Sequence, residues 1–171
     1  MADKLKITTE QVDDIPILLA QGKKIGVPEL LDELFWPHGN WEGTRFGWTA
    51  MVWLTHILSE GDHRLNHVEA WAEKRQHTLE ISTGQQVRGQ EWSDDRLGIV
   101  LDRLADDEKW KAFETNLNRR TFRVYDLKPR RVRVDSTTAS GHWTVTEDGL
   151  FQFGHSKDHR QDLPQLKVMM S

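Results

Sequence analysis

Apolar residues recur at helical spacing from residue 14 to about residue 122, and glycine and proline residues separate the apolar stretches. Apolar side chains three and four positions apart share one face of a helix, so this pattern predicts a series of amphipathic helices. The clearest of them follows Ser93, a residue type favoured at helix N-termini, and has two aspartates in its first turn. The predicted helices span residues 14–20, 27–35, 44–59, 63–79, 94–104 and about 106–122.

The periodicity becomes that of a β-strand after Pro129. Charged and apolar residues alternate from Arg131 to Asp135, so the two valines of this stretch share one face and Asp135 shares the other with the arginines. A Glu147-Asp148-Gly149 sequence further on is typical of a hairpin turn. The predicted strands are residues 131–135, the hairpin arms 142–146 and 150–153, and residues 166–170.

Together these elements predict an α+β chain with two parts. We expect an all-helical domain over residues 1–125 and the first β-strands of a second domain over residues 126–171. The chain is 37% hydrophobic and 29% charged and has eight tryptophans, which is enough apolar material for a core. No stretch approaches the roughly 18 apolar residues of a membrane span, and the N-terminus lacks a signal-peptide pattern, so a cytoplasmic protein outside the membrane is expected.

Charge is distributed unevenly along the chain. Residues 1–118 contain 13 Lys and Arg against 21 Asp and Glu, a net charge of −8, whereas residues 119–171 contain 10 against 6, a net charge of +4. A basic stretch can neutralise DNA phosphates, although such a stretch is also common on a solvated helix end or linker. The excess lies in Arg119, Arg120, Arg123, Lys128, Arg130, Arg131 and Arg133, opposed only by Asp126.

Asp135 is the first candidate for a catalytic residue. A strand holds a carboxylate at a fixed point, and such a group can bridge two Mg²⁺ or Mn²⁺ ions that activate water. Taken alone, an Asp-Ser pair after a strand is more often a turn in which the aspartate bonds to its own backbone. Cysteine is absent, so any metal site would need carboxylate or imidazole ligands.

A longer stretch of sequence favours the catalytic interpretation of Asp135 over the turn. The C-terminal segment resembles the start of the catalytic domain of insertion-sequence transposases of the DDE superfamily, in VRVDSTT at residues 132–138 and in FGHSKDHRQDLPQLK at residues 153–167. The upstream region resembles a helical domain of unknown function that precedes this catalytic domain in one transposase group, in GNWEGTRFGWTAMVWLTHILSEGDHRLNHVEAWAEKR and WSDDRLGIVLDRLADDEKW. The resemblance implies that an incomplete RNase H-like domain follows the helical domain.

The resemblance also implies roles for individual residues. Asp135 matches the first catalytic aspartate, which in that family binds the Mg²⁺ or Mn²⁺ ions. Gln161 stands where the family often has proline, a difference that relaxes a turn without removing a charge. The stretch at residues 153–167, the second motif, could alternatively be a structural turn whose charged side chains are solvated. The residues expected to contact DNA are Lys157, His159 and Arg160 of that motif and Arg130, Arg131 and Arg133 of the basic stretch.

The family's second aspartate and its glutamate are expected downstream of the third strand, beyond Ser171. We therefore expect the N-terminal portion of a DNA transposase. Its expected partners are transposon-end DNA, full-length transposase or the missing C-terminal half, and a homo-oligomer is a further expected state. An unpaired sheet edge would favour pairing with that half or aggregation. Two alternatives stay open, namely a DNA- or transposase-binding regulator of transposition and an inert remnant of a decayed element.

Histidines and tryptophans of the helical part have both a structural and a functional interpretation. His56, His63 and His67, with Asp62, have a spacing that a zinc site can use, but surface or capping roles are more common without cysteine. The four tryptophans between residues 36 and 53 could stack on bases, yet aromatic clusters in helical domains usually form core.

We predict that the 171-residue chain alone neither cleaves nor joins DNA, because one matched carboxylate cannot hold a pair of metal ions. Purified protein incubated with DNA and Mg²⁺ or Mn²⁺ should leave both strands intact on a denaturing gel. Nicking that the Asp135→Ala substitution abolishes would contradict this prediction.

Overall fold

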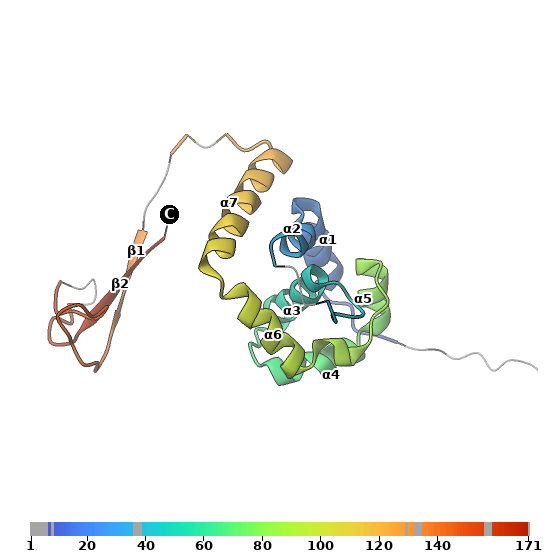
Figure 1. The fold of residues 1–171 in the computed structure, drawn as a ribbon, viewed down its shortest axis with the longest axis horizontal. Coiled ribbons are helices and arrows are strands. Elements are labelled where there is room, and N and C mark those ends of the chain that lie inside the picture. Colours follow the sequence, from blue (N-terminus) through green and yellow to red (C-terminus); the bar gives the residue numbers. More distant parts are fainter. Residues whose placement is uncertain are drawn as a thin grey trace, which may run out of the picture. The chain divides into compact units, whose positions relative to one another are not determined.

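The computed structural model describes residues 7, 9–35, 39–128, 130–131, 135–155 and 159–170, without the side chains at 135, 169 and 170. The chain divides into two compact units, Met1–Leu127 and Lys128–Ser171 (Figure 1). The first unit is helical and the second contains a short two-stranded sheet. The α+β class expected from the sequence is therefore confirmed. No helix among the described residues has both the length and the apolar character needed to cross a membrane.

Seven helices make up the described part of the first unit, together with 3-10 turns at Leu65–His67 and Gly89–Trp92. Helix α3 is buried along most of its length and contacts α1, α2, α4 and α6. The helices are α1 (Ile15–Ile25), α2 (Val27–Leu34), α3 (Phe46–Glu60), α4 (Val68–Glu73), α5 (Gln76–Thr83), α6 (Asp94–Leu104) and α7 (Asp107–Val124).

Five of the six predicted helices are confirmed, as α1, α2, α3, α6 and α7. The single helix predicted over residues 63–79 is wrong, because the chain turns at Lys74 and Arg75 between α4 and α5. Arg75 looked like a solvent-facing position, but only 8% of it is exposed. Its guanidinium lies 2.9 Å from Glu60 and packs over the Trp71 ring at 5.1 Å. This inward ion pair lies at the turn that separates α4 from α5.

Helix α3 approaches α2 very closely. A Cβ at Gly47 would lie 1.9 Å from the carbonyl oxygen of Pro28, so only glycine fits at this position. The backbone N–H of Gly47 also donates to Asp32 Oδ1 at 2.7 Å, which satisfies one free donor in the first turn of α3. Burial raises the pKa of the Asp32 carboxyl. The contact therefore combines close backbone packing with a helix cap.

The tryptophans of the helical unit contribute to the core. Trp48 is buried, and Trp41 and Trp53 are partly buried against the core cluster. Trp92 is fully buried, and its Nε1 donates to the carbonyl oxygen of Thr49 at 3.0 Å. Trp36 lies outside the described residues. The expectation of a core role is confirmed for Trp48 and fits the partial burial of Trp41 and Trp53.

In the second unit, β1 (Asp135–Ser140) pairs antiparallel with β2 (Gln165–Met170). The pairing runs from Asp135 opposite Met170 to Ser140 opposite Gln165. Strand β2 confirms the strand predicted over residues 166–170. Strand β1 occupies the hydroxyl-rich residues after Asp135, where the local sequence favoured a turn. Residues 132–134 of the predicted strand lie outside the described residues.

The predicted hairpin of residues 142–146 and 150–153 is wrong, although its turn forms, with Gly149 N–H donating to Thr146 O at 3.0 Å. The Gln152 side chain donates hydrogen bonds to the carbonyl oxygens of Thr146 and Gly149 at the turn, at 2.8 and 2.9 Å. The Gln152 backbone instead forms a bridge with Gln165. Trp143 stacks on Phe151 at 4.2 Å between ring centroids. Side-chain contacts therefore replace the hairpin ladder.

The close approach at Gly47 gives a stability prediction. Gly47→Ala should lower the free energy of unfolding by about 1–3 kcal/mol, because the new methyl group would overlap a backbone carbonyl. Gly98→Ala is the matched control in α6, where no atom lies within 4 Å of the added Cβ. It should be neutral or stabilise by up to about 1 kcal/mol. Urea unfolding followed by tryptophan fluorescence measures both, and equal effects would contradict the prediction.

Candidate functional site

The predicted catalytic residue lies at one end of the two-stranded sheet. Asp135 is the first residue of β1, and its backbone is opposite Met170 of β2. The sheet therefore fixes the position of its Cα. The Asp135 side chain and the expected DNA-contacting residues Arg133 and Lys157 lie outside the described residues.

The basic stretch before β1 is accessible to solvent. Arg130 and Arg131 are exposed and lie in neither a helix nor a strand. Nearby, Arg119 and Arg123 are exposed on the last turns of α7, whereas Arg120 points inward and donates to the carbonyl oxygen of Gly26 at 3.2 Å. The sequence predicted one basic stretch, but the structure separates exposed arginines from one that anchors α7.

The second motif has an internal ion pair. Arg160 Nε lies 2.9 Å from Asp162 Oδ1, and this hydrogen bond lowers the pKa of Asp162. His159 is exposed, has a backbone φ of 57°, and meets His155 edge to face at 6.4 Å between ring centroids. A DNA phosphate that contacts Arg160 would have to compete with the carboxylate of Asp162.

Two histidines of the possible zinc site, His56 and His67, contact different partners. His67 Nδ1 lies 2.8 Å from Asp62, which also receives the Arg64 guanidinium at 2.9 Å. Hydrogen bonds from Arg64 hold the pKa of Asp62 far below its usual range. His56 is buried edge-on against Trp71 at 5.2 Å. Among the described residues, no three His, Asp or Glu side chains form a group suited to a metal ion.

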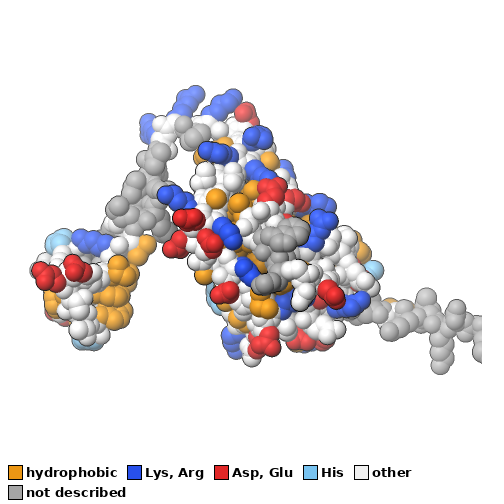
Figure 2. All heavy atoms as spheres, viewed as in Figure 1, with side chains coloured by type: hydrophobic (Ala, Val, Ile, Leu, Met, Phe, Trp, Pro, Cys, Tyr) orange, Lys and Arg blue, Asp and Glu red, His pale blue; other side chains and the backbone are white. Residues whose placement is uncertain are grey.

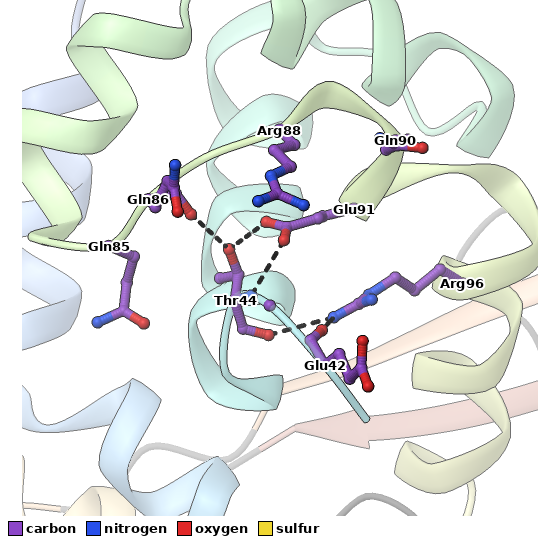
Figure 3. A pocket seen from close by; sticks show the side chains of 9 residues that line it. Glu42, Thr44, Gln85, Gln86, Arg88, Gln90, Glu91 and Arg96 are labelled. Carbon is purple, nitrogen blue, oxygen red and sulfur yellow. Dashed lines mark hydrogen bonds between the residues drawn. The ribbon is translucent and has the colours of Figure 1, made fainter. Parts of the chain in front are cut away.

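A polar cavity of about 590 Å³ lies where the segment before α6 passes the start of α3 (Figure 3). Thr44 and Glu91 point toward each other at its floor: the Thr44 hydroxyl donates to Glu91, and the Thr44 N–H does so at 3.3 Å. Both residues are buried. Gly43, with φ of 78°, leaves room for the carboxylate, because a Cβ there would overlap Glu91 Oε1.

Arg96 closes one side of this cavity. Its Nη2 donates to the carbonyl oxygens of Glu42 at 2.7 Å and Thr44 at 3.2 Å, and its guanidinium stacks on Trp41 at 3.9 Å. Burial lowers the pKa of Arg96, opposed by the charge of Glu91. These contacts are structural, since they satisfy backbone carbonyls before α3.

Residues 7–116 match the family model described as a domain of unknown function, DUF4277. The chain belongs to the DUF4277 family. The matched region includes α1 to α6 and the first part of α7, so the DUF4277 domain corresponds to the helical unit. No curated protein and no solved structure matches the chain.

Sequence patterns did not reveal the residues around the polar cavity of the DUF4277 domain. Glu91 lies between the helices predicted over residues 63–79 and 94–104, and it is 47 positions from Thr44. No local periodicity links such positions. A buried Glu is uncommon without a partner, but the sequence alone does not show that Glu91 is buried.

His56 makes the stability of the DUF4277 domain depend on pH. Burial lowers its pKa, although the nearby charges of Asp62 and Glu60 act in the opposite direction and those of His67 and Arg75 act with burial. The unfolded chain, with a histidine pKa of about 6.5, therefore binds more protons at mildly acidic pH than the folded chain does. Stability should fall as the pH falls below that value.

We predict that the urea midpoint decreases from pH 7.5 to pH 5 and that His56→Phe reduces this decrease, because phenylalanine keeps an aromatic contact with Trp71 but does not titrate. The exposed His63→Gln substitution is the control and should keep the full pH dependence. Equal pH dependence in the His56→Phe variant and the unchanged protein would contradict this assignment.

Proposed function

We propose that this chain is the N-terminal part of a DNA transposase and acts on transposon-end DNA. The observation that carries the proposal is the order of three parts along the chain. A helical DUF4277 domain comes first, an exposed basic segment with Arg130 and Arg131 follows, and β1 then begins at Asp135. Asp135 lies within the sequence that resembles the DDE catalytic domain.

An RNase H-like assignment of the second unit is part of the same proposal. Strands β1 and β2 pair with each other, and among the described residues Gln152 adds a single further bridge, to Gln165 of β2. The rest of their outer edges could accept further strands. The unit also exposes large apolar side chains, with Leu150 at 78% and Phe153 at 60%. A larger sheet and its covering elements would bury such side chains.

Asp135 has the role of a metal ligand in this proposal. Mg²⁺ or Mn²⁺ held by a complete set of carboxylates would activate water and stabilise the leaving oxygen at a DNA phosphate. The described residues contain no group of three His, Asp or Glu side chains suited to that task. The function proposed for the described part of the chain is recognition of DNA.

The exposed arginines support DNA as the partner. Phosphate contacts release counterions, so each one adds affinity that weakens with salt. Arg130 and Arg131 are exposed in a segment without regular structure, where they can adjust to a phosphate backbone. Figure 2 shows that Lys and Arg side chains also gather around the C-terminal end of α7.

A gel-shift experiment across a salt series tests the proposal. The probe is a duplex carrying the terminal inverted repeats that flank the gene, and we predict binding at low salt that weakens steeply as salt rises. Joint replacement of Arg130, Arg131 and Arg133 by alanine should reduce the slope of log K against log salt by about 0.9 for each lost phosphate contact. Absence of any shift at low salt would contradict the proposal.

A further inference from the structure

Helix α7 has one face packed on the helical unit and one face open to solvent. Phe113 is buried, Leu117 packs against the core, and Arg120 binds Gly26 and approaches Glu33 at 3.5 Å. Figure 1 shows α7 along the edge of this unit. The outer face of α7, on the opposite side, includes Lys111, Thr115, Asn118, Arg119, Phe122 and Arg123, all of them exposed, and the first part of the helix also exposes Glu108 and Glu114.

The polar groups of the side chains on this outer face are free to bind a ligand. Within the described part of the chain, Lys111, Asn118, Arg119 and Arg123 have no side-chain hydrogen bond or ion pair. Phe122 leaves 45% of its surface in water.

The charge of α7 changes along its length. Its first turn contains Asp107 and Glu108, which favour the positive end of the helix dipole. From Thr115 to Val124 it contains three arginines and no acidic residue. Residues 1–118 carry a net charge of −8, so the end of α7 is a local concentration of basic residues in a unit that is otherwise net acidic. This concentration is complementary to a polyanion.

Helix α1 adds a further cation beside the same end. Lys24 Nζ lies 4.7 Å from the ring centroid of Tyr125, the residue that follows α7. Lys23 also lies in the last turn of α1, so two lysines accompany the arginines of α7. They occupy the flank, where phosphates would lie if α7 entered a DNA groove.

We infer that the outer face of α7 reads base edges in the major groove of duplex DNA. This inference rests on the proposed function and names the element that recognises the transposon end. The width of an α-helix with its side chains, about 10–12 Å, matches the major groove of about 12 Å. Arginine pairs with guanine, asparagine pairs with adenine, and an aromatic ring contacts the thymine methyl group. Arg119, Asn118 and Phe122 supply these three contacts, and Lys111 and Arg123 contact phosphate.

Fluorescence anisotropy with the full chain tests this inference, using the terminal-repeat duplex and a scrambled duplex of equal length. Arg119→Ala should lower the preference for the terminal repeat by roughly 5- to 100-fold, because the bidentate contact with guanine is lost. Arg119→Lys should keep the affinity for the scrambled duplex and still lose the preference, since lysine keeps the charge without the planar fork. Lys111→Ala should weaken both complexes equally.

The control is Lys74→Ala, which removes an exposed positive charge from the turn between α4 and α5 and should leave binding unchanged. Circular dichroism should show that every variant remains helical. Retention of the preference by Arg119→Ala, or equal binding of both duplexes by the unchanged protein, would overturn α7 as the reading element. The first result would leave the proposed function intact, whereas no binding to either duplex would refute the proposed function itself. If Arg119→Ala keeps the preference for the terminal repeat but no longer self-associates in size-exclusion chromatography, the face is a protein interface, and this result would also overturn the inference.

Discussion

The close approach of α2 and α3 at Gly47 is the contact on which the helical unit depends. With the Pro28 carbonyl 1.9 Å from a hypothetical Cβ at Gly47, the two helices lie closer together than any larger residue would allow. This approach brings Asp32 within 2.7 Å of the Gly47 N–H and buries the start of α3 against the core. Since α3 also packs on α1, α4 and α6, a shift of its first turn would disturb most of the core.

The second half of the unit is attached to the same turn of α3 by polar contacts. Glu91 accepts from Thr44, and Trp92 donates to the Thr49 carbonyl, so two consecutive residues fasten the segment before α6. A buried carboxylate is costly unless it is hydrogen-bonded, and Thr44 provides two donors. These contacts set where α6 begins. The α3 helix therefore contacts α6 directly, whereas α7 packs mainly on α2 and α1.

Periodicity predicted the helices well because their apolar stripes are buried in one common core. Arg75 shows where this reasoning fails, since a charged residue looked solvent-facing but turns inward to Glu60 and Trp71. The hairpin prediction failed for a similar reason. A Glu147-Asp148-Gly149 turn suggested a hairpin there, but the Gln152 side chain bonds to carbonyls of the turn and its backbone forms a bridge with Gln165 instead. Long-range side-chain contacts of this kind leave no periodic signal in the sequence.

The candidate site was predictable only in part. The resemblance over residues 132–138 indicated Asp135, and the charge count indicated a basic region, but neither distinguishes Arg119 from Arg120. That distinction depends on the helical rotation of α7, which turns Arg120 toward Gly26 and Arg119 toward solvent. Anchoring by Arg120 and exposure of Arg119 are compatible, because the two residues lie on different faces of the same helix. Because Arg120 and Phe113 hold the inner face against the helical unit, little backbone conformational entropy would be lost if the outer face bound the proposed DNA partner. Anchoring on one face thus makes recognition by the other face more favourable.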